Sequence, residues 1–179
     1  MRTIALSYGG LAGALVISAM IAGFLLGADR ASSSSVWLGY LTMVVALSLI
    51  FLGVKRYRDV EKGGVVKFLP AFLVGLAIAA VAGVVYVVGW EIYLAATGYA
   101  FMGEYTAAMI EAKRAAAPAG PALDAEIAKL REMEAMYANP VFRVPITFLE
   151  IFPVGLVIAL ISAALLRNPK VLPRRAAAA

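Results

Sequence analysis

Long stretches without charged residues dominate the pattern of polar and apolar positions along this chain. Three of them lie between Arg2 and Asp29, between Arg30 and Lys55, and between Lys67 and Glu91. Each is longer than the roughly 20 apolar residues with which a helix crosses a bilayer. A fourth apolar stretch, residues 143–167, is interrupted only by Glu150. The pattern predicts four transmembrane helices over about residues 4–27, 36–54, 68–97 and 141–166.

The segment between the third and fourth stretches, residues 98–140, has a different pattern. Its apolar residues recur at helical spacing in two arms, formed by Phe101, Tyr105, Met109 and Ala112 and by Leu123, Ile127, Leu130, Met133 and Tyr137. Between the arms, Pro118 and Pro121 interrupt the helix. We therefore expect an external helical hairpin, its first arm continuous with the third span. Packing of the two arms on each other is favoured, and a protein partner bound to the hairpin is the alternative.

These elements predict an all-α integral membrane protein with one domain over residues 1–179. It consists of a four-transmembrane-helix bundle and an extramembrane helical hairpin between helices 3 and 4. The composition agrees, because 63% of the residues are hydrophobic and 15% are charged, whereas about a quarter are charged in soluble domains. A cleaved signal peptide is the alternative for the first span, but the h-region of such a peptide has only about 7–15 residues.

Small residues recur at intervals of four in the predicted spans. Examples are Gly9 and Gly13 in the first span, Gly23 and Gly27 near its end, Gly75, Ala79 and Gly83 in the third, and Gly155, Ala159 and Ala163 in the fourth. In lipid, close backbone approach at small residues supplies the contact between helices. We expect these residues to hold the chain's own bundle together, and a dimer interface is the alternative.

Basic residues are unevenly distributed among the segments outside the spans. The N-terminus, the link over residues 55–67 and the C-terminal tail hold one, five and four of them, whereas the first link holds one and the hairpin four. Basic segments stay on the cytoplasmic side, so both termini and the 55–67 link should be cytoplasmic. The net charge of +5 fits this bias and contact with the lipid bilayer. No basic, aromatic-interleaved domain is present to bind nucleic acid.

The chain contains no cysteine and no histidine. This excludes disulfides, thiolate nucleophiles, and the usual zinc and haem ligands. No two carboxylates are paired at short spacing within a span, and no glycine-rich phosphate loop is present. We therefore predict no catalytic residue, no cofactor, no metal ligand and no enzyme activity.

Two charged residues of the spans have the same predicted depth. Glu91 lies 24 residues from Lys67, and Arg143 lies 24 residues from Arg167, which is roughly 36 Å of helix in each case. Since the hydrocarbon core is about 30 Å thick, both residues reach the outer interface on consecutive antiparallel spans. We expect a salt bridge between them. An aromatic belt is expected at this level, formed by Trp90, Tyr93 and Tyr99.

Glu150 lies deeper, on a helix face that also carries Thr147 and Arg143. Facing lipid, its ionised carboxylate would cost on the order of 2.5–3.5 kcal/mol. It should therefore face the bundle, with the Tyr86 hydroxyl as a donor and Arg143 as the nearby cation. The resulting intramembrane polar cluster comprises Glu91, Arg143, Thr147, Glu150 and Tyr86. A structural clasp between spans three and four is favoured, and a small proton- or cation-coupled transporter using Glu150 is the alternative.

Four segments carry a resemblance to a known family: WLGYLTMVVALSLIFLGVKRYRD, GGVVKFLPAFLVGL, GWEIY and NPVFRVPITFLEIFPVGLVIALISAALLR. They resemble a family of small bacterial membrane proteins known only as a domain of unknown function. The resemblance implies a multi-pass protein of the bacterial inner (cytoplasmic) membrane, with four spans and an external insertion before the last. It implies no activity or substrate. Our first hypothesis is therefore a structural, assembly or partner-binding membrane protein.

Overall fold

The regular structure of this protein is helical throughout the residues that the computed structural model describes, 1–26 and 33–173. The helices are α1 (Arg2–Leu25), α2 (Ser33–Leu47), α3 (Leu49–Arg56), α4 (Phe68–Ala96), α5 (Ala100–Ala116), α6 (Pro121–Tyr137) and α7 (Pro140–Leu166). A π-helical turn, η1 (Tyr57–Glu61), follows α3 directly. The sequence interpretations that involve Gly27, Asp29, Arg30, Arg174 and Arg175 lie outside the described residues.

Four helices of the described part are long and apolar enough to cross a membrane. They are Arg2–Leu25, Trp37–Glu61, Phe68–Ala96 and Pro140–Leu166. Large apolar side chains are exposed on all four, for example Leu6, Trp37, Val88 and Leu149. So much exposed apolar surface is unusual for a soluble monomer and suits helices surrounded by lipid. The predicted all-helical class and the four predicted apolar spans are confirmed.

The second span continues beyond its predicted end at residue 54, through α3 and η1 to Glu61. The charged residues that follow Val54 predict a link there, but two of them are accommodated within the folded chain. Lys55 donates to the carboxylate of Asp59, one helical turn further on, and Arg58 is completely buried. Because these charges have partners close by, the helix does not need to end where they begin.

Arg58 attaches the segment after α7 to this end of the second span. Its Nη1 and Nη2 donate to the carbonyl oxygens of Val171 and Leu172 at 2.8 and 2.6 Å. Its Nε donates to the carboxylate of Asp59 at 2.7 Å. Each of the three nitrogens of this buried guanidinium therefore has a hydrogen-bond acceptor, as burial of a charge requires.

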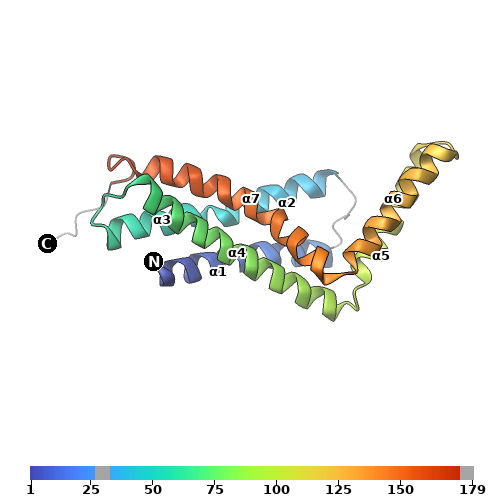
Figure 1. Ribbon diagram of the computed structural model, residues 1–179, viewed down its shortest axis with the longest axis horizontal. Helices are drawn as coiled ribbons and strands as arrows, with labels where there is room; N and C mark the ends of the chain where they lie inside the picture. The colour runs from blue at the N-terminus through green and yellow to red at the C-terminus, as the bar shows by residue number, and fades with distance from the viewer. Residues whose placement is uncertain (27–32, 174–179) are drawn as a thin grey trace.

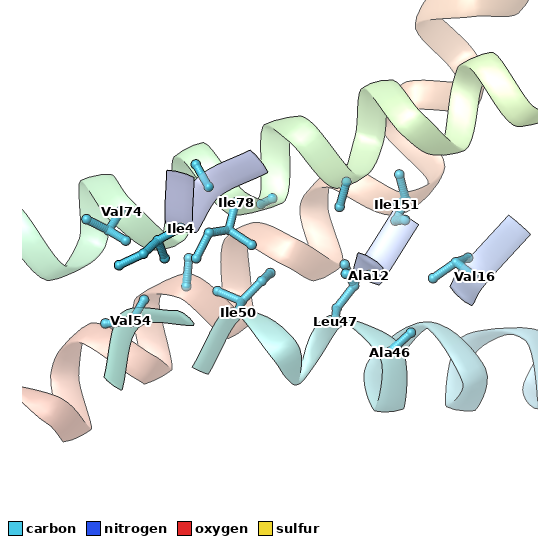
Figure 2. Packing of buried hydrophobic residues seen from close by; sticks show 14 of the residues in the cluster. Ile4, Ala12, Val16, Ala46, Leu47, Ile50, Val54, Val74, Ile78 and Ile151 are labelled. Carbon is cyan, nitrogen blue, oxygen red and sulfur yellow. The ribbon is translucent and has the colours of Figure 1, made fainter. Parts of the chain in front are cut away.

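Helix α4 lies at the centre of the bundle, with α1 and α7 as its main neighbours and α3 in contact with all three. Figure 1 shows these helices running along the long axis of the molecule. Branched and small apolar side chains fill the space between them, including Ile4, Ala12, Leu47, Ile50, Val54, Val74, Ile78 and Ile151 (Figure 2). The bundle is therefore built around one apolar core.

Glycines bring α1 against the backbone of α4. A methyl group added at Gly9 would lie 2.6 Å from the carbonyl oxygen of Ile78, and one at Gly13 would lie 2.5 Å from that of Ala82. Neither position has room for any side chain. Gly9 and Gly13 therefore pack against another helix of the same chain, as the favoured interpretation expects.

A reciprocal contact of small residues joins α4 to α7. A methyl group at Gly75 would lie 2.8 Å from the Cβ of Ala159, and one at Gly155 would lie 2.9 Å from the Cβ of Ala79. Each glycine thus faces an alanine of the other helix. These glycine–alanine contacts set the distance between α4 and α7.

Helices α5 and α6 lie side by side and project away from the bundle, at the end opposite to the start of α1 and the end of α7 (Figure 1). We call them the α5–α6 pair. Helix α4 ends at Ala96, and the chain turns through Gly98 and Tyr99, whose φ angles are 63° and 59°. The expectation that the first arm continues the third span is therefore wrong, because this left-handed turn separates α5 from α4.

Candidate functional site

Arg143 and Glu91 form a bidentate ion pair between α7 and α4. The guanidinium Nε lies 2.7 Å from Oε1, and Nη2 lies 2.7 Å from Oε2. Arg143 is only 3% exposed, whereas the Glu91 side chain is 28% exposed. Two parallel charge-assisted bonds restrict orientation more strictly than a single contact does. The pair therefore sets the depth and the rotation of α7 relative to α4.

The third nitrogen of the same guanidinium reaches the end of α6. Nη1 of Arg143 donates to the carbonyl oxygens of Tyr137 and Ala138 at 3.1 and 3.3 Å. The last carbonyls of a helix have no partner within the helix and carry its partial negative charge. Arg143 thus caps α6 as well as pairing with Glu91. One side chain links α4, α6 and α7.

A tight junction between α6 and α7 places Arg143 in this position. Asn139 is the N-cap of α7, and its side chain accepts a hydrogen bond from the Val141 N–H at 3.0 Å. Pro140 follows at the first helical position, where its missing N–H removes no helical bond. The chain therefore passes from α6 to α7 with only Ala138 and Asn139 between the two helices. As a result, Arg143 in the first turn of α7 lies beside the carbonyls that end α6.

The indole of Trp90 packs inside the protein rather than in an outward belt. It is 4% exposed, stacks on Tyr93 with ring centroids 5.3 Å apart, and meets the edge of Phe101 at 4.8 Å. Its Nε1–H donates to the Tyr137 hydroxyl at 2.7 Å. The expectation of an aromatic belt is thus wrong for Trp90, because the α5–α6 pair supplies a partner for the buried N–H.

Tyr137 and Thr147 lie between the Glu91–Arg143 ion pair and Glu150. Burial raises the pKa of the Tyr137 hydroxyl above its ordinary value, and the hydrogen bond from Trp90 opposes this effect. Tyr137 therefore stays neutral near physiological pH. Thr147 is 1% exposed. Its Oγ1 lies near the Tyr137 hydroxyl but has no hydrogen bond of ordinary geometry in the described part of the chain.

Glu150 is separate from the Glu91–Arg143 pair. Its Oε2 accepts a hydrogen bond from the Tyr86 hydroxyl at 3.3 Å, so the expected donor is in place. Arg143 is engaged by Glu91 and by the end of α6, and no ion pair joins Glu150 to a cation among the described residues. The expectation that Arg143 compensates Glu150 is therefore wrong, because Glu91 and the end of α6 occupy the guanidinium.

Glu150 lines a cleft of about 310 Å³ between the bundle and the α5–α6 pair. The other residues around it are aromatic, aliphatic or methionine side chains. The five residues predicted as one cluster are thus arranged as two pairs, Glu91 with Arg143 and Tyr86 with Glu150, and a buried Thr147.

Residues 7–168 match the family described as "Protein of unknown function (DUF4199)". This match spans most of the chain. The chain belongs to the DUF4199 family. No match was found among curated proteins or among solved structures. The resemblance noted in the sequence is therefore confirmed, and function in this DUF4199 protein has to be argued from its geometry.

Sequence reasoning missed the part that the α5–α6 pair plays in the site of this DUF4199 protein. Tyr137 supplies both a carbonyl to Arg143 and a hydroxyl to Trp90, and Tyr105 and Met133 line the cleft. One signal was available for Tyr137. It is the last residue of an apolar stripe directly before Asn139 and Pro140, so its carbonyl had to find a donor outside α6.

Proposed function

We propose that this DUF4199 protein is a non-enzymatic protein of the bacterial inner membrane that serves assembly with a protein partner. In this proposal the α5–α6 pair is an extramembrane hairpin on the non-cytoplasmic side, and it presents the partner-binding surface. The observation that carries the proposal is the position of Arg143. Its guanidinium ties the end of α6 to both α4 and α7, so the hairpin is held in one orientation.

The charges of the α5–α6 pair support its placement outside the hydrocarbon core. Four charged residues occur in α5 and six in α6, and each would be costly within the bilayer. The basic residues of the second span, together with Arg167 and Lys170 after α7, gather at the opposite end of the bundle. The positive-inside rule assigns this end to the cytoplasm. The hairpin then faces the other side of the membrane.

Near the tip of the hairpin, the two helices are joined by apolar contacts and by an ion pair. Near the tip, Ile110 and Leu123 are both 8% exposed, and Lys113 pairs with Glu126 across the two helices. Leu123 belongs to the predicted stripe of the second arm, whereas Ile110 lies outside the predicted stripe of the first arm, of which Ala112 is exposed. These contacts support packing of the two helices on each other, with a buried face on α5 that differs from the predicted one. The outer faces carry mixed charges, so a partner would meet a polar surface. Rigid presentation of such a surface lowers the entropy lost on binding.

A coupled transporter is the second candidate, because Glu150, a residue of the fourth span, lines an open cleft. Transport would need further polar groups along the spans. The hydroxyls of Thr42, Ser48 and Ser162 instead donate to carbonyl oxygens of their own helical segments. A continuous polar path from Glu150 to the opposite end has no support in these contacts. The assembly function is therefore the better supported of the two.

Site-specific photo-crosslinking in the native membrane tests the proposal. A photoreactive residue at Ala128, an exposed position of α6, should trap one partner in a defined stoichiometry. The same group at Val65, which is exposed at the opposite end of the bundle, should not trap it. The crosslink should also weaken in Arg143→Ala. No crosslink from Ala128, together with proton-linked uptake in vesicles that Glu150→Gln abolishes, would establish the transporter instead.

A further inference from the structure

The walls of the cleft beside Glu150 have an unusual composition. The cleft measures about 310 Å³ and receives side chains from α1, α4, α5, α6 and α7. Aromatic rings and thioethers predominate, among them Tyr86, Trp90, Tyr105, Met20 and Met133. Among the described residues that line it, Glu150 is the one that is charged. An apolar site with one carboxylate selects its ligand both by shape and by charge.

The Glu150 carboxylate has acceptor capacity that the described part of the protein does not use. An ionised carboxylate offers about four lone-pair positions. Glu150 accepts one hydrogen bond, the 3.3 Å bond from Tyr86, and that hydroxyl also lies 3.4 Å from the sulfur of Met20. No lysine or arginine of residues 1–26 and 33–173 lines the cleft, and Arg143 is held by Glu91 and the end of α6. When Glu150 is ionised, its negative charge therefore has no cationic partner among the described residues that line the cleft.

Three kinds of occupant can be compared with this geometry. A hard metal ion requires about six to eight oxygen ligands, and no group of three or more His, Cys, Asp or Glu side chains that could hold a metal occurs in the described residues. A lipid acyl chain would cover the carboxylate without giving it a partner, which is unfavourable. An organic cation with apolar substituents suits both the Glu150 carboxylate and the apolar walls. Its charge meets the carboxylate, and its substituents meet the rings and thioethers.

We propose that this cleft binds an amphiphilic organic monocation, such as a substituted ammonium compound. Glu150 is the counter-ion, and Tyr86, Trp90 and Tyr105 form the aromatic wall. The volume lies at the lower end of the range of small-molecule sites, about 300–1,000 Å³, so the ligand is small. This binding site does not depend on the partner proposed for the α5–α6 pair.

Trp90 provides an intrinsic reporter for the test. The chain has two tryptophans, and Trp90 lines the cleft, so Trp37→Phe leaves it as the single indole. The full chain in phosphatidylcholine nanodiscs is titrated with benzyltrimethylammonium and, separately, with its uncharged carbon isostere neopentylbenzene. We expect a saturable change in Trp90 fluorescence with the cation. The isostere should bind at least about tenfold more weakly, because it lacks the ionic and cation–π attraction.

Variants separate the charge of the cleft from its shape. Glu150→Gln should weaken binding of the cation by at least about tenfold and bring its affinity close to that of the isostere. Glu132→Gln, which removes an exposed carboxylate of α6, is the matched control and should bind as the parent does. Ile146→Trp, which fills one wall of the cleft, should abolish binding of both compounds.

Three results would overturn the proposal. They are equal affinity for the cation and its isostere in the parent protein, unchanged affinity in Glu150→Gln, and no saturable fluorescence change with the cation. The first two would indicate an apolar slot that suits lipid, and the third would indicate that no ligand enters. If Glu150→Gln does not fold, the comparison of the two compounds on the parent protein still decides, because it needs no substitution at Glu150.

Discussion

The guanidinium of Arg143 lies against the carboxylate of Glu91 through two contacts of 2.7 Å, and its remaining nitrogen caps the carbonyls of Tyr137 and Ala138. The two residues are separated by 52 positions in the sequence. Their contact joins the third and fourth spans at the point where the α5–α6 pair leaves the bundle. The ion pair is thus the junction of the membrane part and the projecting part.

Tyr137→Phe tests the hydrogen bond that attaches α6 to the indole of α4. Without the hydroxyl, the Nε1–H of Trp90 loses its acceptor in a buried site, which costs about 1–3 kcal/mol. We expect a lower free energy of unfolding in detergent and a shifted emission maximum of Trp90 in the Trp37→Phe background. Tyr40→Phe changes a tyrosine that is 51% exposed and should alter neither quantity. Parent-like stability of Tyr137→Phe would show that the bond is not needed.

Gly9→Ala and Gly10→Ala form a matched pair on adjacent positions of α1. The new methyl group at position 9 would lie 2.6 Å from the carbonyl oxygen of Ile78, whereas at position 10 nothing lies within 4 Å. We expect the first change to destabilise the bundle by about 1–3 kcal/mol through overpacking. The second should be neutral or slightly stabilising, because alanine favours the helix. Equal unfolding free energies for the two variants would contradict the close approach of α1 and α4.

Arg58→Ala tests how the segment after α7 is attached. The substitution leaves the carbonyls of Val171 and Leu172 without their donor, at a cost of about 1–3 kcal/mol for groups that become unsatisfied. Amide exchange and proteolysis over residues 167–173 should both become faster. Arg56→Ala, which removes an exposed arginine of the same span, should leave them unchanged. Similar exchange in both variants would rule out the attachment.

The Lys113–Glu126 pair predicts a pH dependence at the tip of the α5–α6 pair. The hydrogen bond and charge of Lys113 hold the pKa of the Glu126 carboxyl below its ordinary value. Because the folded-state pKa is lowered, the pair stabilises the fold at pH values above the ordinary pKa of about 4.3. That contribution is lost as the pH falls through the lower, folded-state pKa.

Carboxyl-carbon NMR of Glu126 measures this effect directly. Lys113→Ala should return the pKa of Glu126 towards its ordinary value, whereas Arg131→Ala should not move it by a comparable amount. The effect on overall stability should be small, since Glu126 is exposed and water screens the interaction. An unchanged titration in Lys113→Ala would mean that the two helices are not paired at this point.

Counting residues from Lys67 and from Arg167 was enough to place Glu91 and Arg143 at one level, because the rise per residue of a helix is nearly constant. Depth alone does not define which direction a side chain faces. Thr147 and Glu150 share a helix face with Arg143, yet Glu150 opens onto a cleft and Arg143 bonds elsewhere. Glu91, the end of α6 and Glu150 are all possible partners of Arg143. A single sequence does not show which of them the guanidinium binds.

The residues that sequence reasoning placed wrongly depend on contacts between distant segments. Tryptophan is a residue type typical of an interfacial belt, but the hydroxyl of Tyr137 accepts a hydrogen bond from Trp90 and allows the indole to be buried. Arg58 belongs to a run of charges that predicts an exposed link, yet the carbonyls of residues 171 and 172 allow it to be buried. In both cases the decisive partner lies more than 40 residues away.

Distance measurement between spin labels tests the central claim, that Arg143 holds the α5–α6 pair in a fixed orientation on the bundle. Since the chain has no cysteine, labels can be placed uniquely at Ala125 on α6 and Val88 on α4, which are both exposed. Double electron–electron resonance should give a narrow distance distribution in the parent protein and in Arg131→Ala, and a broad or shifted one in Arg143→Ala. A distribution in Arg143→Ala that matches the parent in position and width would contradict the claim.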